Sequence, residues 1–251
     1  MKRTILGMPV DALTMDEVLL RCRAALESRD RLLVGVVNAA KMVKLRQDVH
    51  LRDSLLDCDL LLADGQSVVW ASRLLRAPLP ERVAGIDLFE RLLEVGARDG
   101  WSVYLLGAKP DVLAQLRRRL ASRFPALKIA GSHDGYFSDA DASTVAEDIR
   151  ASGADMLFLA MPSPSKEIFL GDWGPSLGVP VLHGVGGSFD VLAGVTKRAP
   201  LRWQKLGLEW LYRVIQEPSR MWRRYLTTNG RFIALVLHER IRRQSPYERS
   251  R

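Results

Sequence analysis

The chain has 251 residues, of which 47% are hydrophobic and 26% charged, and its formal net charge is +8. This length and composition suit one α/β domain with a sizeable core, alone or with a small appendage, and exclude a disordered chain. Two cysteines are too few for a disulfide framework or a cysteine-based zinc site. The charge is uneven. Residues 197–251 hold 14 Lys and Arg against four Glu, a net +10, whereas the remaining residues hold 23 basic and 25 acidic side chains, a net −2.

Short runs rich in Val and Leu alternate with amphipathic segments, a pattern typical of βα units around a parallel sheet. The first helix is marked by a capping box at Thr14 and Glu17. Strands are predicted at Leu32–Val37, Leu60–Ala63, Ser102–Leu106, Lys128–Gly131, Met156–Ala160 and Val179–His183. Helices are predicted between them, at Ala39–Arg46, Ser67–Leu75, Leu88–Arg98, Asp111–Phe124, Ala142–Ala151 and Lys166–Asp172. The fold class is therefore α/β, with a Rossmann-like, mostly parallel sheet that has helices on both faces.

The composition changes near Ala199-Pro200, which divides the chain into a core of residues 1–199 and an appendage of residues 200–251. The appendage is predicted to be helical and basic, with an interruption at Pro218. Its arginines Arg213, Arg220 and Arg223 alternate with aromatic residues and have a spacing that places them on roughly one helical face. This composition suits a membrane surface with anionic headgroups. A nucleic-acid phosphate surface is the alternative.

The N-terminal apolar run is broken by Pro9 and Asp11, so it is too short for a secretory signal. No stretch of about 18 apolar residues is present to span a membrane. We therefore expect the protein to be cytoplasmic.

In an open parallel sheet, ligands bind outside the carboxyl ends of the strands. The candidate site is therefore sought in the loops that follow the predicted strands. Glycines 184, 186 and 187 follow one strand, and they would let backbone amides approach a diphosphate, with Asp190 accepting hydrogen bonds from a ribose or uracil. The alternative is a tight structural turn, since Phe189 stands where the G-x-G-x-x-G pattern has its last glycine.

Two charged residues near strand ends have candidate roles. Asp64 ends an apolar strand and is suitably placed to be a general base, or it caps a helix that begins near Ser67. Arg82 lies between two helical segments, where it would contact a phosphate through two parallel hydrogen bonds or pair with Asp87 or Glu81. The histidines show no metal-ligand spacing.

Together, several ordered segments between about residues 4 and 235 resemble the bacterial WecG/TagA/CpsF glycosyltransferases, glycosyltransferase family 26. The matching segments are Val37–Ala39, Ala63–Gly65, Arg82–Asp87, Leu105–Pro110, Gly131–Phe137, Gly184–Gly187 with Asp190, Lys197–Pro200, Leu206–Arg213 and Glu217–Arg220. The resemblance implies an enzyme on the cytoplasmic face of the inner membrane that moves a sugar from a UDP-sugar to a sugar on undecaprenyl diphosphate. The transfer would invert the anomeric centre and need no metal or other cofactor. The donor sugar would be N-acetylmannosamine, its uronic acid or glucose, and the product would enter a surface polysaccharide.

The resemblance also implies roles for particular residues. Asp64 is expected to be the catalytic base, and the acceptor diphosphate is expected to meet Arg82, Arg213, Arg220 and Arg223. We assign donor binding to the loops after the strands, at Asn38, Gly107, Tyr136, Lys166, Glu167, Gly184, Gly186, Gly187 and Asp190. The expected partners are the UDP-sugar, the polyprenyl-diphosphate-linked acceptor and anionic inner-leaflet lipids, but not nucleic acid.

The chain departs from the family pattern at one segment. Where many members read Gly-x-Pro-Lys-Gln-Glu, residues 162–167 read Pro-Ser-Pro-Ser-Lys-Glu. Lys166 therefore adds a cation near the expected donor site. One interpretation is that it selects an acidic donor sugar, or one that differs from those of other family members. The alternative is that it contacts a phosphate of the donor. Two functions from other classes remain as alternatives, an NAD-dependent oxidoreductase and a nucleic-acid-binding protein with a basic tail. The glycine loop follows the last predicted strand instead of the first, which argues against the oxidoreductase.

Overall fold

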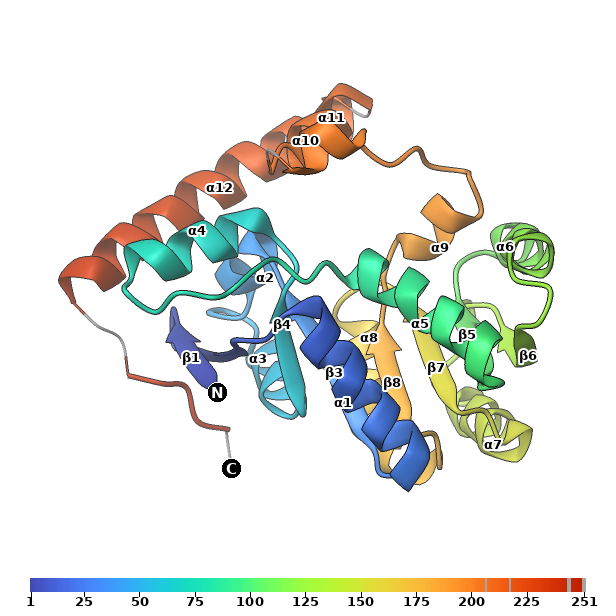
Figure 1. Cartoon of the computed structure of the whole chain (residues 1–251). Coiled ribbons are helices and arrows are strands. Elements are labelled where there is room, and N and C mark those ends of the chain that lie inside the picture. Colours follow the sequence, from blue (N-terminus) through green and yellow to red (C-terminus); the bar gives the residue numbers. More distant parts are fainter. Residues whose placement is uncertain (206, 217, 243–244, 250–251) are drawn as a thin grey trace.

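The computed structural model describes residues 1–205, 207–216, 218–242 and 245–249, with the side chains of residues 205, 213 and 218–226 outside the description. At its centre is a six-stranded sheet of parallel strands in the order β4-β3-β8-β7-β5-β6 (Figure 1). The strands are β3 (Leu32–Val37), β4 (Leu60–Ala63), β5 (Ser102–Gly107), β6 (Lys128–His133), β7 (Met156–Ala160) and β8 (Val181–Gly184). The predicted α/β, Rossmann-like class is confirmed.

Alternate residues of the strands enter different hydrophobic cores, because successive side chains of a strand point to opposite faces of the sheet. In β3, Val34 and Val36 join the core formed with α1, α5, α6 and α9, whereas Leu33 joins the core formed with α7 and α8. Helices therefore cover both faces, as predicted (Figure 1). These helices are α1 (Met15–Ser28), α5 (Gly85–Asp99), α6 (Pro110–Arg123), α7 (Ala142–Ser152), α8 (Ser165–Trp173) and α9 (Ser188–Leu192).

An N-terminal hairpin that the sequence analysis did not predict builds a third core. Strands β1 (Lys2–Ile5) and β2 (Met8–Asp11) pair antiparallel around Leu6 and Gly7, which have φ angles of 49° and 82°, as a tight hairpin turn requires. The buried Asp11 accepts a hydrogen bond from the backbone N–H of Leu61 at 2.9 Å, which joins the hairpin to β4. Three helices of the first half of the chain also contribute to this core: α2 (Ala39–Lys44), α3 (Val49–Leu56) and α4 (Gln66–Leu74).

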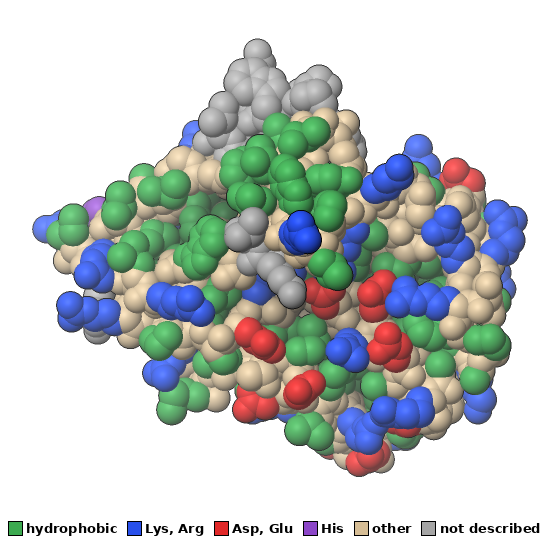
Figure 2. All heavy atoms as spheres, turned by 45° about the horizontal axis from the view of Figure 1, so that its top comes forward, with side chains coloured by type: hydrophobic (Ala, Val, Ile, Leu, Met, Phe, Trp, Pro, Cys, Tyr) green, Lys and Arg blue, Asp and Glu red, His purple; other side chains and the backbone are tan. Residues whose placement is uncertain are grey.

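The C-terminal segment is helical, as predicted, and consists of α10 (Leu201–Lys205), α11 (Glu209–Gln216) and α12 (Pro218–Ile241). Pro218 begins α12, which confirms the predicted interruption. Arg213 belongs to α11, and Arg220 and Arg223 belong to α12. The prediction that they share one face concerns side chains outside the described part of the structure. Helix α12 buries Phe232 and Val236 in the third core. Figure 2 shows that hydrophobic side chains also gather on the outer surface over the C-terminal helices.

Most predicted bounds are correct within a few residues, and the differences have local causes. The last strand begins at Val181 instead of Val179, because Pro180 has no N–H and contributes only its carbonyl, which accepts from Leu32 N at 2.7 Å. The capping box of α1 is present, with Glu17 N donating to Thr14 and Thr14 N donating to Glu17. Helix α3 and the 3-10 turn η1 (Gly174–Ser176) were not predicted.

Candidate active site

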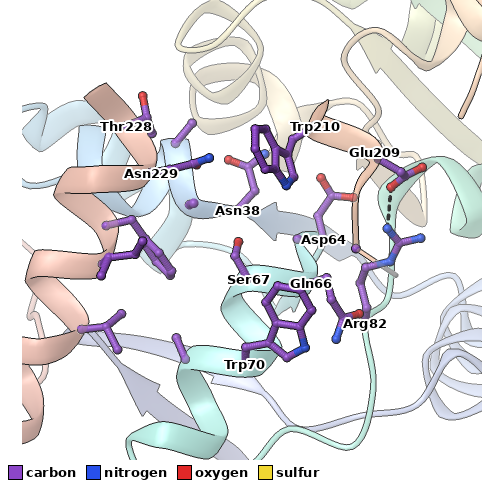
Figure 3. A pocket seen from close by; sticks show the side chains of 18 of the residues that line it. Asn38, Asp64, Gln66, Ser67, Trp70, Arg82, Glu209, Trp210, Thr228 and Asn229 are labelled. Carbon is purple, nitrogen blue, oxygen red and sulfur yellow. Dashed lines mark hydrogen bonds and ion pairs between the residues drawn. The ribbon is translucent and has the colours of Figure 1, made fainter. Parts of the chain in front are cut away.

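A cavity of about 520 Å³ lies at the carboxyl edge of the sheet, between the ends of β3 and β4 and the C-terminal helices. Its wall is formed by the start of α2, helix α4, the segment that leads into α5, and parts of α11 and α12. Figure 3 shows Asp64 between Asn38 and Arg82, with Trp70 and Trp210 on either side. A concave site with a few converging polar groups is the usual form of a ligand-binding site.

Asp64 follows β4 and borders the cavity. Its backbone N–H donates to the carbonyl of Val37 at 2.9 Å, and its Oδ1 accepts from Gly85 N, the first residue of α5, at 2.9 Å. The alternative that Asp64 caps α4 is wrong, because the residue before that helix is Gly65 and no side chain caps it. The carboxylate is thus held by the start of a helix, and the side chain borders the cavity (Figure 3).

Arg82 is held in a network of four charges at one end of the cavity. Its guanidinium lies 2.5 Å from Glu209 of α11 and 3.6 Å from Asp87. Arg198 lies 2.6 Å from Asp87 and 3.4 Å from Glu209, so the two arginines share the same two carboxylates. The pairing of Arg82 with Asp87 was one of the predicted alternatives, whereas the pairing with Glu209 was not predicted. Glu81, the other predicted partner, accepts instead from Met15 N at 2.6 Å. The network joins the core to the C-terminal helices.

The opposite end of the cavity is apolar. Helix α12 contributes Phe232, Ile233, Val236 and Leu237, and α4 contributes Trp70, Ala71 and Leu74. The cavity therefore joins a charged end, with the carboxylate and arginines, to an apolar end between two helices. Such a shape matches a ligand with a polar head and a hydrocarbon chain.

A buried charged cluster lies beside the cavity, at the ends of β7 and β8. Glu167 accepts hydrogen bonds from Ser163 at 2.7 and 2.9 Å and pairs with Lys41 at 3.0 Å. Lys166 Nζ lies 3.4 Å from Glu167 and 3.2 Å from the Ser163 hydroxyl. The stem of Lys166 lies so close to Gly184 that a Cβ there would be 3.1 Å away, and its ammonium faces Gly186.

Burial and neighbouring charges shift the pKa values of Lys166 and Glu167. Desolvation, with a smaller contribution from Lys41, lowers the pKa of Lys166 to about 8, while Glu167 and Asp64 oppose the change. Burial alone would raise the pKa of Glu167, but Lys41, Lys166 and Ser163 together lower it. The structure therefore brings four predicted donor residues together at the carboxyl edge of the sheet: Lys166, Glu167, Gly184 and Gly186. Lys166 is close enough to Asp64 to feel its charge.

The other predicted donor residues lie along the same edge. Gly187 is exposed just before α9, and Asp190 accepts two backbone hydrogen bonds through its carbonyl. Gly107 has a φ of 124° and packs against β7, while Tyr136 is 69% exposed on the neighbouring loop. Asn38 lines the cavity, and its side chain accepts from Lys41 N. Asn38 is the one predicted donor residue among the described residues that line the cavity with Asp64. The other eight do not line it: Gly107, Tyr136, Lys166, Glu167, Gly184, Gly186, Gly187 and Asp190.

The side chains of the remaining predicted residues, Arg213, Arg220 and Arg223, lie outside the described part of the structure. In their place, Arg198 and Glu209 line the cavity, and Lys41 completes the buried cluster. These three residues were not among the predicted site residues. Arg198 and Glu209 stand inside segments quoted for the family resemblance, which was the available signal.

Within the described ranges, no group of three or more His, Cys, Asp or Glu residues is arranged to hold a metal ion. An Asp-x-Asp motif can hold a metal-bound sugar nucleotide, and the sequence contains Asp-x-Asp at residues 57–59 and 139–141. Asp59 accepts from Leu33 N at 2.7 Å, at the amino end of the sheet and away from the cavity. His183 is buried and contacts the carbonyls of Val34 and Gly85, each at 3.1 Å, as expected for a core histidine.

The parallel sheet, the glycine loop at its carboxyl edge and the adjoining cavity with a fixed carboxylate define an α/β enzyme with its site in the loops after the strands. A family model described as the glycosyl transferase WecG/TagA/CpsF family matches residues 3–246. The chain belongs to this family, and it is a glycosyltransferase of cell-surface polysaccharide synthesis. This result favours the glycosyltransferase over the oxidoreductase and the nucleic-acid-binding protein.

Proposed function

We propose that this glycosyltransferase moves a sugar from a UDP-sugar to a sugar carried on undecaprenyl diphosphate and inverts the anomeric centre. The observation that carries the proposal is the position of Asp64 between a charged and an apolar end of one cavity. The donor sugar is N-acetylmannosamine, its uronic acid or glucose, and no metal takes part.

The acceptor has a charged diphosphate and an apolar chain, and the cavity has a charged end and an apolar end. Its diphosphate suits the end with Arg82 and Arg198, because guanidinium groups bind phosphates through paired hydrogen bonds. The first isoprene units suit the apolar end between α4 and α12. The acceptor sugar then lies near Asp64.

Asp64 acts as the general base of the transfer. It takes the proton of the acceptor hydroxyl, whose oxygen forms the new bond to the anomeric carbon. The bond from that carbon to the UDP oxygen breaks with its electron pair, and UDP leaves from the opposite face. The hydrogen bond from Gly85 N fixes the orientation of the carboxylate without occupying both oxygens.

The leaving diphosphate is stabilised from the side of β8. The glycine loop and the ammonium of Lys166 lie together at the end of β8, where we place the growing negative charge. The N–H of Gly186 already donates to the carbonyl of Leu159 at 3.2 Å, so the N–H of Gly187 and the ammonium of Lys166 are the proposed donors. Pre-oriented donors in a partly dry site are effective at this task. Lys166 pairs with Glu167 at 3.4 Å, but Glu167 also has Lys41 and Ser163 as partners, so we propose that a phosphate or a sugar carboxylate shares the ammonium of Lys166.

The C-terminal appendage, residues 200–251, places the enzyme on the cytoplasmic face of the inner membrane. Helix α12 exposes Ile233, Leu237 and Ile241, each four residues apart, and α4 exposes Trp70 and Leu74. These side chains form an apolar strip, the kind of surface that lies in a membrane interface. No helix in the described ranges is long and apolar enough to cross a membrane.

The apolar strip has a direct test. Because α12 also buries Phe232 and Val236, deletion of the appendage would damage the core, so exposed residues are the better targets. The double variant Leu237→Gln/Ile241→Gln should bind vesicles of phosphatidylcholine and phosphatidylglycerol less well than Leu20→Gln, a matched change on α1. Equal binding by the two variants would contradict membrane docking through the strip.

The reaction itself is tested by incubating the protein with a panel of UDP-sugars and short polyprenyl-diphosphate-linked GlcNAc or glucose. Mass spectrometry should find a lipid-linked disaccharide with one donor and release of UDP, in buffer with EDTA as in buffer with Mg²⁺. NMR of the product should show the anomeric configuration opposite to that of the donor. A retained configuration, or transfer only with metal, would contradict the proposal.

A further inference from the structure

A second hollow, of about 490 Å³, lies where β1, the end of α4 and the last part of α12 come together. It is lined by the cationic residues Lys2, Arg3, Arg76 and Arg240 and by one acid, Glu239. The cations come from three separate segments of the chain, so the fold gathers them. Neither the proposed base nor the proposed phosphate-binding arginines belong to this hollow.

The cations of the hollow are poorly neutralised. Arg240 donates to the carbonyl of Leu74, which fixes it at the end of α4 without cancelling its charge. Arg3 Nε is buried and has no hydrogen-bond partner among the described residues. Lys2 Nζ is 3.8 Å from Asp11, whose carboxylate also accepts from the backbone of β4. Within the described ranges no carboxylate forms an ion pair with Arg3, Arg76 or Arg240.

The hollow adjoins the apolar strip. Leu74 lines both the hollow and the apolar end of the cavity, and Arg240 lies beside the exposed Ile241 of α12. In Figure 2, hydrophobic side chains run over the C-terminal helices toward an end where Lys and Arg side chains are also found. A phosphate group directly beside hydrocarbon chains is the chemistry of a phospholipid, and it differs from that of a free phosphate or a nucleic acid.

We propose that this hollow binds the phosphate of an anionic phospholipid, separate from the lipid-linked substrate, next to the apolar end of the acceptor cavity. The inference rests on the proposed membrane-docked function and adds a second, non-substrate lipid to it. Arg3 and Arg76 contact the phosphate, while Arg240 is held in place by α4. The bound lipid fixes the enzyme with its cavity opening toward the bilayer, where the acceptor diffuses.

The test compares vesicle binding by two matched double variants. Arg3→Gln/Arg76→Gln removes two charges from the hollow, and Arg117→Gln/Arg118→Gln removes two exposed charges from α6, at the opposite side of the sheet (Figure 1). Cosedimentation is measured with vesicles of phosphatidylcholine alone and with an equimolar mixture of phosphatidylcholine and phosphatidylglycerol. Because a basic residue at an anionic surface contributes about 1 kcal/mol, the hollow variant should bind mixed vesicles about 30-fold more weakly. The α6 variant should stay close to wild type at physiological salt, where charges more than about 8 Å from the lipid are screened.

The other outcomes also decide the matter. Equal binding of the two variants to mixed vesicles would overturn the proposal, as would tight binding of soluble glycerol 3-phosphate that the hollow variant loses, since that ligand has no hydrocarbon chain. Thermal unfolding checks that each variant is folded, and Lys2→Gln/Arg76→Gln, both on exposed residues, replaces the first variant if Arg3→Gln unfolds. The assay contains no UDP-sugar. The vesicle assay is therefore independent of catalysis. If the separate assay with UDP-sugars showed no glycosyl transfer, the proposed function would be refuted, and a positive vesicle result would still support the lipid site.

Discussion

The ion pair between Arg82 and Glu209 makes a prediction about how the acceptor enters. Glu209 lies 2.5 Å from Arg82 and 3.4 Å from Arg198, so its carboxylate contacts both arginines proposed to bind the acceptor diphosphate. A diphosphate that binds there must displace Glu209. The variant Glu209→Gln removes the competing charge and keeps the side-chain size, so it should bind inorganic pyrophosphate more tightly than the wild type.

The magnitude follows from the geometry. A hydrogen bond to a charged group contributes about 1.5–3 kcal/mol, and the lower value applies because the Glu209 side chain is 28% exposed. Loss of about 1.5 kcal/mol of competition corresponds to roughly tenfold tighter binding. The variant also loses a contact between the core and α11, so its Tm should fall by about 3–6 °C.

Isothermal titration calorimetry with pyrophosphate measures the effect. Glu94→Gln is the matched control, because Glu94 is an exposed carboxylate on α5 that also pairs with an arginine, Arg91, at 3.5 Å. The control should match the wild type, and Arg82→Gln should lose binding. If Glu209→Gln weakened binding as much as Arg82→Gln, Glu209 would orient the arginine instead of competing for it, and the reasoning would be refuted.

Three further predictions concern the buried cluster, the backbone and the thiols. Because burial lowers the pKa of Lys166 to about 8, its ammonium is charged below that pH and neutral above it. The kcat/KM for the UDP-sugar should therefore fall above about pH 8 in the wild type, and a profile in which Lys166→Gln kept that fall would contradict the role. Gly107→Ala should destabilise the protein by about 3 kcal/mol or more in urea unfolding, since its Cβ would lie 2.6 Å from the backbone of β7. Gly153→Ala, at a positive φ in open space, should cost only about 1 kcal/mol, and equal costs would refute the clash. Burial raises the pKa of Cys22 and Cys58 to about 12, so neither thiol should react with Ellman's reagent at neutral pH before unfolding, and rapid labelling of the folded protein would disprove this.

The sheet was predictable where the sequence carries local information. The strands Leu32–Val37, Leu60–Ala63 and Met156–Ala160 were predicted at their observed bounds, because each is an apolar run that ends at polar or turn-forming residues. The N-terminal hairpin was missed because Pro9 and Asp11 interrupt its apolar pattern. In the fold, Asp11 is buried and satisfied by β4, a partner 50 residues away that no local pattern reveals.

The candidate site was predictable only in part, for the same reason. Topology alone places Asn38, Asp64 and the glycine loop at one edge, since they follow parallel strands. The partners of these groups come from far along the chain. Glu209 reaches Arg82 across 127 residues. Asp64 does not cap α4, which was the alternative to its role as base, and instead accepts a hydrogen bond from the start of α5. Such contacts depend on how helices pack, which the local sequence does not encode.

The most direct test of the proposed mechanism is the turnover of Asp64→Asn with saturating UDP-sugar and a short polyprenyl-diphosphate-linked acceptor. Asparagine keeps the hydrogen bond from Gly85 N but cannot take the proton of the acceptor hydroxyl. We expect kcat to fall by about 10²–10⁴-fold while binding of both substrates is maintained. Near-wild-type turnover by this variant would contradict the assignment of Asp64 as the base and, with it, the proposed mechanism at this cavity.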